Sequence, residues 1–175
     1  MHTLLADLGL PMVLRYYQIA RSDNSVVGIG ALNPSKKIMG WAMGSPRPDR
    51  INSALRSPLP WFAFQMLRVL FTRPIIFFQL ISSVLSSSAE TEMKSDIIEL
   101  TYIGVAADQR GKGLGRNLLN AFIDASRKKS FHSVVLSVER ENGSAIALYK
   151  KAGFKITKTF SEGRYERHRM ELTLE

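Results

Sequence analysis

The sequence contains no cysteine, and it has only three histidines among 175 residues. Without cysteine there is no disulfide framework, no thiolate metal site and no cysteine nucleophile. The histidines, at positions 2, 132 and 168, do not have the spacing of metal ligands. We therefore expect no metal, and we expect His132 to be a loop residue without a functional role.

Long hydrophobic runs are also missing. A membrane-spanning helix needs roughly 20 consecutive apolar residues, and the nearest approach, residues 59–85, is interrupted five times. The interrupting residues are Gln65, Arg68, Arg73, Pro74 and Gln79. The N-terminus lacks a basic leader ahead of an apolar core, so it does not resemble a signal peptide. These features favour a cytoplasmic protein.

Acidic residues are few relative to basic ones: 15 Asp and Glu face 24 Lys and Arg, which gives a net charge of +9. Such a balance favours anionic partners: nucleic acid, a membrane surface or a polyphosphorylated cofactor. Many cations lie in residues 47–73 and 150–169, where solvated surface faces would explain them equally well. The charge alone therefore selects no partner. The composition is otherwise ordinary for a folded protein, and the length suits a single domain over residues 1–175.

The first half of the chain predicts helices around one hairpin. Hydrophobic spacing indicates a helical opening that breaks or restarts near residues 9–11. Two β-type stretches follow at 26–32 and 38–43, joined by a turn at 33–36. Residues 50–85 then predict two or three helices divided by prolines, with a serine-rich loop after them.

The second half alternates strands with helices. We expect strands at 97–105, 133–138, 154–159 and 165–174, and helices at 117–129 and 144–151. The strands 97–105 and 133–138 should be parallel because a helix joins them. The order predicts an α/β fold.

The strongest local signal is the segment 109–115, between a strand and a helix. Gly111, Gly113 and Gly115 alternate, which exposes backbone N–H groups to an anion, and the following helix N-terminus adds its own donors and dipole. Three cations supply countercharge: Arg110, Lys112 and Arg116. The segment therefore predicts a phosphate or pyrophosphate site. A glycine-rich turn without a ligand is the alternative.

Two common phosphate motifs do not fit this segment. A Walker A loop needs Ser or Thr after its lysine, but Gly113 follows Lys112. The dinucleotide pattern G-x-G-x-x-G fails as well, because its last glycine would fall on Arg116 or Leu118.

Two blocks of the sequence resemble the GNAT superfamily of N-acetyltransferases. Residues 110–115 fit the pattern R/Q-x-x-G-x-G/A, and residues 142–154 fit N-x-x-A-x-x-L-Y-x-x-x-G-F. The second block also has a physical reading of its own, with Asn142 as a helix N-cap and Gly153 as a left-handed residue after the helix C-terminus. The resemblance is clear over residues 97–158 and weaker over 26–43. The family's opening strand is missing from the pattern, so either it is absent or the chain begins late.

This resemblance implies a mixed, centrally splayed sheet flanked by helices, with a helical insertion at about 50–88 on the acceptor side. It implies acetyl-CoA as acyl donor and direct attack of an amine on its thioester. Main-chain groups of the central strand would bind the pantetheine arm and steady the oxyanion, and the glycine segment would hold the pyrophosphate. The implied cofactor-binding residues are Ile103, Gly104, Val105, Arg110, Gly111, Lys112, Gly113, Leu114, Gly115, Arg116, Asn142, Ala145 and Tyr149.

Two catalytic residues follow from the same resemblance. Tyr149 matches the tyrosine that protonates the departing thiolate; the alternative is a core tyrosine with one satisfied hydroxyl. Glu99 is the candidate general base, acting directly or through water, and an exposed charge is its alternative. Strand alternation would put Glu99, Thr101 and Ile103 on one face unless a bulge intervenes. Glu139 is a weaker substitute.

The acceptor is less well defined by the sequence. We expect a primary amine on a small molecule or peptide, and no nucleic acid, because no recognition helix or RNA-binding signature is present. The aromatic residues within 50–85 could pack on the sheet, line a cleft or contact a membrane surface; packing and cleft lining are favoured. The sequence does not decide between a monomer and a homodimer. It also does not decide between an enzyme and a sensor that binds acyl-CoA without transfer.

Overall fold

The computed structural model describes residues 8–72, 75, 95–162 and 165–174. The contacts divide the chain into two compact units. The first comprises Met1–Asn24, Pro48–Glu92 and Glu162–Arg164, and the second comprises Ser25–Arg47, Met93–Ser161 and Tyr165–Glu175. The expectation of one domain over the whole chain stays a prediction.

The described part of the first unit is helical. It contains α2 (Leu10–Ser22), α3 (Pro48–Leu55) and α4 (Leu59–Thr72). Helix α2 begins after Gly9 with a proline in its first turn, where the missing N–H has no cost, and it buries Met12, Tyr16 and Ala20 at four-residue spacing. The predicted restart near residues 9–11 is confirmed, while residues 1–7 lie outside the described part of the chain.

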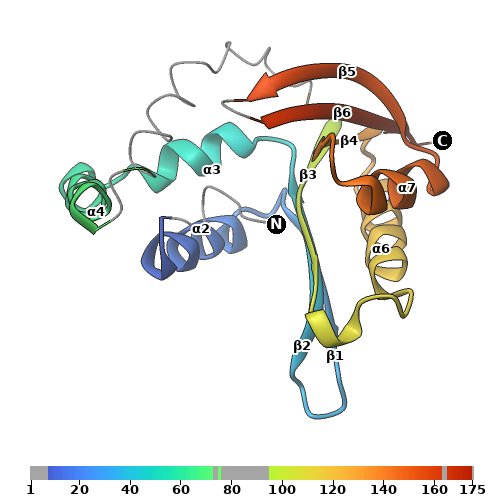
Figure 1. Ribbon diagram of the computed structural model, residues 1–175, viewed down its shortest axis with the longest axis horizontal. Helices are drawn as coiled ribbons and strands as arrows, with labels where there is room; N and C mark the ends of the chain where they lie inside the picture. Colours follow the sequence, from blue (N-terminus) through green and yellow to red (C-terminus); the bar gives the residue numbers. More distant parts are fainter. Residues whose placement is uncertain (1–7, 73–74, 76–94, 163–164, 175) are drawn as a thin grey trace. The chain divides into compact units, whose positions relative to one another are not determined.

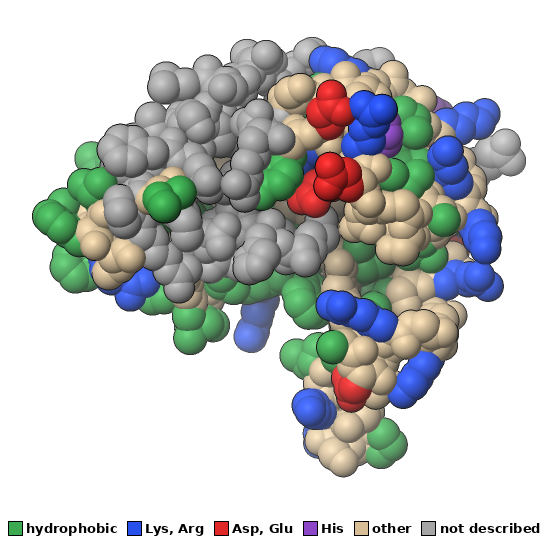
Figure 2. All heavy atoms as spheres, in the orientation of Figure 1, with side chains coloured by type: hydrophobic (Ala, Val, Ile, Leu, Met, Phe, Trp, Pro, Cys, Tyr) green, Lys and Arg blue, Asp and Glu red, His purple; other side chains and the backbone are tan. Residues whose placement is uncertain are grey.

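Helices α3 and α4 confirm two of the helices expected within 50–85. The helical residues predicted beyond Thr72 lie almost wholly outside the described ranges. The Arg15 guanidinium of α2 lies 4.9 Å from the centroid of the Trp61 ring and donates a hydrogen bond to the Ser57 carbonyl. On α4 the side chains of Phe64 and Phe71 are exposed, and hydrophobic side chains gather over this helix in Figure 2. Among the described helices, none is both long and apolar enough to cross a bilayer.

The second unit is built on a six-stranded sheet with the order β1-β2-β3-β4-β6-β5. Figure 1 shows α6 and α7 beside it. Its elements are β1 (Val27–Leu32), β2 (Ile38–Ser45), β3 (Ile97–Val105), η1 (Ala107–Gln109), α6 (Leu114–Lys128), β4 (Ser133–Glu139), α7 (Gly143–Lys151), β5 (Lys155–Glu162) and β6 (Tyr165–Thr173). Every predicted strand is present, and β3 and β4 are parallel as expected. The pairs β1 with β2, β2 with β3 and β4 with β6 are antiparallel.

One face of this sheet carries the core. Apolar residues of β1 to β4 and β6 pack there against α6 and α7, and Phe122 of α6 is completely buried. A Cβ added to Gly44 of β2 would lie 2.5 Å from the Phe122 ring and 2.4 Å from the Glu99 carbonyl oxygen. Glycine at this position therefore lets α6 lie close against the strands.

A bulge interrupts the alternation of β3. Met43 of β2 pairs with Tyr102, but the next residue, Gly44, pairs with Leu100, so Thr101 is the extra residue. The expectation that Glu99, Thr101 and Ile103 share one face is therefore wrong. By register, Glu99 lies on the same face as Tyr102, opposite to the face that α6 covers.

Helix α6 begins at Leu114, three residues earlier than the sequence predicts, because Gly115 belongs to its first turn. Glycine is tolerated there because the first N–H groups of a helix have no intrahelical partner in any case. The other end of α6 is closed by Ser130 in the left-handed conformation, with φ of 60°. Ser130 N–H donates to Arg127 and Phe131 N–H donates to Ser126, which is a Schellman motif.

Candidate functional site

The segment between β3 and α6 adopts the conformation that its glycines allow. Gly111 and Gly113 have positive φ angles of 76° and 82°, and a Cβ added to either would meet no atom within 4 Å. Gly113 is the N-cap of α6 and makes no side-chain capping bond. Gly115 differs, because its added Cβ would make ordinary contacts with Leu148 and Val105. The first two glycines therefore serve the backbone path and leave open space around it.

This path leaves a row of backbone donors without protein acceptors. Within the described residues, the N–H groups from Gly111 to Arg116 have no hydrogen-bond partner, and the first bond of α6 is from Asn117 N–H to the Gly113 carbonyl. Consecutive donors at a helix N-terminus attract an anion through their partial charges and the helix dipole. The arrangement fits a phosphate or pyrophosphate group.

Three exposed cations surround this row: Arg110, Lys112 and Arg116. The Arg110 Nε lies 3.4 Å from the carbonyl oxygen of Val105, the last residue of β3. This contact holds the Arg110 stem near the end of the strand. Positive charge and N–H donors thus occur together at the head of α6.

The two central parallel strands separate next to this segment. β3 and β4 pair at Ile97 with Ser133, at Ile98 with Val134 and at Glu99 with Val135, and no later pair is made although β3 continues to Val105 and β4 to Glu139. We call this opening the fork. Since the carboxyl ends of parallel strands lie at one edge of a sheet, α6 and α7, which follow these strands, both begin there. In Figure 1, β3 continues beside β2.

The end of β3 presents peptide groups to the fork. Ala106 N–H donates to the Met39 carbonyl of β2 at 2.8 Å. Because peptide groups alternate along a strand, those of Gly104 turn to β2 and those of Ile103 and Val105 turn to the opposite side, where β4 no longer pairs. Of the three residues implied as pantetheine contacts, Ile103 and Val105 thus have main-chain groups directed into the fork.

Helix α7 brings the second sequence block to the same edge. Asn142 is its N-cap, and its Oδ1 accepts a hydrogen bond from Ala145 N–H at 3.2 Å. The C-terminus is a Schellman motif, in which Gly153 N–H donates to Lys150 and Phe154 N–H donates to Tyr149, with Gly153 at a φ of 97°. Both structural expectations for this block are confirmed. Since Ala145 N–H is already satisfied, Ala145 can contribute only its small side chain to a ligand.

Tyr149 is a buried residue of α7. Its ring centroid lies 5.8 Å from that of Phe154, which is the apolar contact that accompanies a Schellman motif. Burial raises the pKa of the Tyr149 phenol to about 12. Among the described residues its hydroxyl has no hydrogen-bond partner. Its role as the acid that protonates the thiolate, and the alternative of a core tyrosine, stay predictions.

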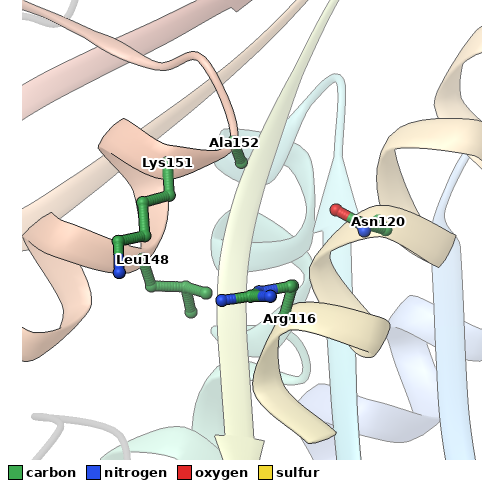
Figure 3. Close-up of a pocket in the computed structure, with 5 residues that line it drawn as sticks. All are labelled: Arg116, Asn120, Leu148, Lys151 and Ala152. Carbon is green, nitrogen blue, oxygen red and sulfur yellow. The ribbon is translucent and has the colours of Figure 1, made fainter. Parts of the chain in front are cut away.

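A hollow of about 290 Å³ lies between α6 and α7. Its lining residues are Arg116, Asn120, Leu148, Lys151 and Ala152. Figure 3 shows the Arg116 guanidinium of α6 pointing toward Leu148 of α7. The hollow adds Lys151 and Asn120 to the groups near the head of α6, and neither was singled out from the sequence. Their signal, one polar residue on each of two helices, is too common to be informative.

Glu99 is engaged in an ion pair that the sequence did not predict. Arg169 of β6 donates to both carboxylate oxygens of Glu99, at 2.7 and 3.2 Å, and also donates to Ser137 Oγ at 3.0 Å. The Arg169 and Glu99 side chains are only 20% and 15% exposed. The alternative of an exposed charge is therefore wrong for Glu99. Its role as general base stays a prediction.

No metal site is indicated within the described residues, where no three or more His, Asp or Glu side chains are grouped suitably for a metal ion. The donors that the structure brings together are backbone N–H groups and cations, which bind anions. The class defined by this fold and site is thus an α/β protein with a row of open backbone donors beside a forked parallel strand pair.

The chain belongs to the acetyltransferase (GNAT) family, whose pattern matches residues 10–154. L-methionine sulfoximine/L-methionine sulfone acetyltransferase of Pseudomonas aeruginosa is 43% identical over 53 residues, which is 30% of this chain and 31% of that protein. Mycothiol acetyltransferase of Renibacterium salmoninarum is 41% identical over 56 residues, 32% of this chain and 17% of that protein. The matches thus span less than a third of these relatives.

Solved structures agree on the fold. The protein YncA of Salmonella typhimurium, whose structure contains its cofactor acetyl-CoA, gives a TM-score of 0.58 at 20% identity, covering 93% of this chain and 72% of that one. The ribosomal-protein-S18-alanine N-acetyltransferase of Escherichia coli gives a TM-score of 0.54 at 19% identity, covering 90% and 75%. The predicted GNAT-like α/β fold is confirmed.

Proposed function

We propose that this chain transfers an acetyl group from acetyl-CoA to a primary amine by direct attack of the amine while both substrates are bound. The observation that supports it most is the row of open N–H groups from Gly111 to Arg116, which lies at the head of α6 beside the fork. Membership of the GNAT family and the acetyltransferase activities named for its relatives support the same reaction.

In this proposal the head of α6 holds the pyrophosphate of the cofactor. The N–H groups donate to phosphate oxygens, and Arg110, Lys112 and Arg116 balance their charge. The open space around Gly111 and Gly113 leaves room for the anion to approach the backbone. Arg116 also lines the hollow between the helices together with Lys151, so positive charge extends from the pyrophosphate site toward α7.

The fork positions the reacting end. The peptide groups of Ile103 and Val105 would pair with the pantetheine arm as an added strand does, and an N–H group there would donate to the oxyanion that develops at the carbonyl. Acetyl-CoA supplies the activated thioester. As the C–N bond forms and the C–S bond breaks, the amine loses a proton to Glu99 or to water.

Tyr149 supplies the proton for the departing sulfur in this proposal. With a pKa raised to about 12 by burial, its phenol is protonated throughout the neutral range. The phenol therefore carries a proton that it can offer as a hydrogen bond to the departing sulfur. Because the conjugate thiol has a lower pKa, roughly 8.5 by analogy with cysteine, complete transfer of that proton to the thiolate is uphill. Asn142 acts by capping the helix that carries Tyr149.

The acceptor that we propose is a small-molecule or peptide amine. The relatives and structural neighbours are named for L-methionine sulfone, spermidine and an alanine of ribosomal protein S18. These compounds define a panel for testing: L-methionine sulfone, spermidine and a short peptide with an N-terminal alanine. The thiol released from acetyl-CoA in the presence of each amine measures transfer.

A binding experiment tests the cofactor site separately. Isothermal calorimetry with acetyl-CoA should show binding by the wild type, and Gly113→Ala should weaken it by about tenfold or more, because alanine disfavours the positive φ on which the donor row depends. Gly30→Ala is the matched control, since an added Cβ there also meets open space but φ is not positive. We expect it to change the affinity less than about twofold. Equal affinities for both variants would contradict the proposed site.

The same experiments decide between transfer and the alternatives. A sensor would bind acetyl-CoA in calorimetry yet release no thiol with any amine, beyond the rate without protein. A protein whose glycine segment meets nucleic acid instead would bind it with steep salt dependence and ignore acetyl-CoA. We expect cofactor binding together with amine-dependent thiol release.

A further inference from the structure

The ion pair between Arg169 and Glu99 lies where the central strands part. Arg169 is on β6 and faces Ser137 of β4 in the antiparallel register, while Glu99 is on β3 in the last residue pair that joins β3 to β4. The Arg169 side chain thus reaches across β4 to β3 at the point where the backbone ladder ends. Its contact with Ser137 Oγ at 3.0 Å fixes it midway.

The geometry of this pair immobilises the carboxylate. Two N–H groups of one planar guanidinium meet the two oxygens of Glu99 at 2.7 and 3.2 Å, which sets both the position and the plane of the carboxylate. A glutamate side chain otherwise has considerable rotamer freedom, which would have to be lost each time it engaged a substrate. The low exposure of both partners shields the pair from solvent screening.

We propose that Arg169 is a positioning residue that holds the Glu99 carboxylate at the fork for the incoming amine. The inference depends on the proposed acetyl transfer, in which Glu99 meets the acceptor. The two Arg169 N–H groups use two of the roughly four acceptor positions that a carboxylate offers. Glu99 alternates with the core residues Ile98 and Leu100, so it acts on the face opposite to α6, whereas the pyrophosphate donors lie at the head of α6. Loss of Arg169 should therefore lower turnover of the acceptor amine and leave acetyl-CoA affinity unchanged.

A different role for the pair is a side-chain tie that keeps the fork at its width. In that case loss of Arg169 would alter the strands that bind the pantetheine arm, so acetyl-CoA affinity and thermal stability would fall together. The two roles therefore differ in whether loss of Arg169 lowers acetyl-CoA affinity and thermal stability.

Steady-state kinetics on four variants test the proposal, with the best amine of the panel as acceptor. Arg169→Gln and Glu99→Gln should each lower kcat/KM for the amine by about 10- to 100-fold. The kcat/KM of the double variant for the amine should be no lower than that of the less active single variant, because the two residues act as one unit. Arg169→Lys should restore part of the loss, since its single ammonium cannot bind both oxygens. The acetyl-CoA dissociation constant should stay within about twofold throughout.

Arg140→Gln is the matched control. It removes the same charge from another Arg–Glu pair, Arg140 with Glu166, whose side chains are 61% and 56% exposed. We expect unchanged kinetics from it. The proposal is overturned if the Arg169 variants weaken acetyl-CoA binding as much as amine turnover, if the single losses multiply in the double variant, or if kcat/KM for the amine is unaffected. A wild type that binds acetyl-CoA but acetylates no amine contradicts the proposed function itself, and this inference with it.

Discussion

Tyr149 is placed by local backbone chemistry as well as by its surroundings. Its carbonyl accepts the Phe154 N–H in the Schellman motif that ends α7, and the two rings pack together. The glycine that this motif requires, Gly153, is part of the same sequence block. A residue chosen from a motif for its chemistry is therefore fixed by the turn that the motif encodes.

The raised pKa of Tyr149 predicts a pH-dependent contribution to stability. Because the folded pKa of about 12 lies above the ordinary tyrosine pKa of 10.0, the contribution is fully present below pH 10 and is lost as pH rises to 12. The loss is about 2–3 kcal/mol in the free energy of unfolding, at about 1.4 kcal/mol for each pKa unit. Urea unfolding of the wild type and of Tyr149→Phe from pH 8 to 12 measures this loss, which appears as a change in the difference between their free energies of unfolding.

Groups that titrate in both proteins, such as lysines, cancel in that difference. A difference that stays constant from pH 8 to 12 would show that the phenol titrates normally. In the thiol-release assay at neutral pH, Tyr149→Phe should lower kcat by roughly 100-fold, in the range of a lost general acid, with acetyl-CoA affinity retained.

Single residues differed in how far the sequence could predict them. The backbone roles of Gly113, Asn142 and Gly153 follow from local chemistry, which a short motif contains in full. Arg169 could not be found in this way, because its partner Glu99 is distant in sequence and lies two strands away in the sheet. Only the cross-strand register, which depends on the whole sheet, brings the two together.

At the scale of single elements, α6 has a left-handed residue at each end. Gly113 precedes its first residue, and Ser130 follows its last turn with φ of 60°. Glycine adopts this conformation without steric cost, whereas serine does not. The N-terminal end is thus relaxed and the C-terminal end carries a conformational penalty.

Ser130→Gly should therefore stabilise the protein. Relief of the left-handed penalty, roughly 1–2 kcal/mol, exceeds the entropy that glycine adds to the unfolded chain, so we expect a net gain of about 0.5–1 kcal/mol. Chemical unfolding measures the gain, with Ser130→Ala as a control that keeps the penalty. Destabilisation by Ser130→Gly would show that the serine side chain makes a contribution that the backbone angle does not reveal.

The elements themselves were predicted well where one local signal dominates. Strand β3 matches its predicted bounds because β-branched and aromatic residues fill it, and the turn after β1 follows its Asn and Pro composition. The start of α6 was missed because glycine reads as loop although the first helical turn tolerates it. The bulge at Thr101 was missed because it depends on the partner strand.

At the scale of the whole molecule, the candidate site depends on chain topology. Two parallel strands end at one edge, each is followed by a helix, and the strands part after Glu99 and Val135. The order of elements along the sequence predicts the first two features, because a helix between strands makes them parallel. The fork itself was implied only by the family resemblance. The extent of the helical insertion stays untested beyond Thr72, where most residues lie outside the described ranges.

Cofactor binding at this site depends most on the backbone donors at the head of α6, and amide NMR observes them directly. Titration of ¹⁵N-labelled protein with acetyl-CoA should give its largest amide shift changes from Gly111 to Arg116, with further changes at Ile103 and Val105. Gly28 and Gly30, on the edge strand β1, provide internal reference amides that should not move. Saturable binding that leaves the amides from Gly111 to Arg116 unchanged, or no change anywhere in the spectrum, would contradict the account.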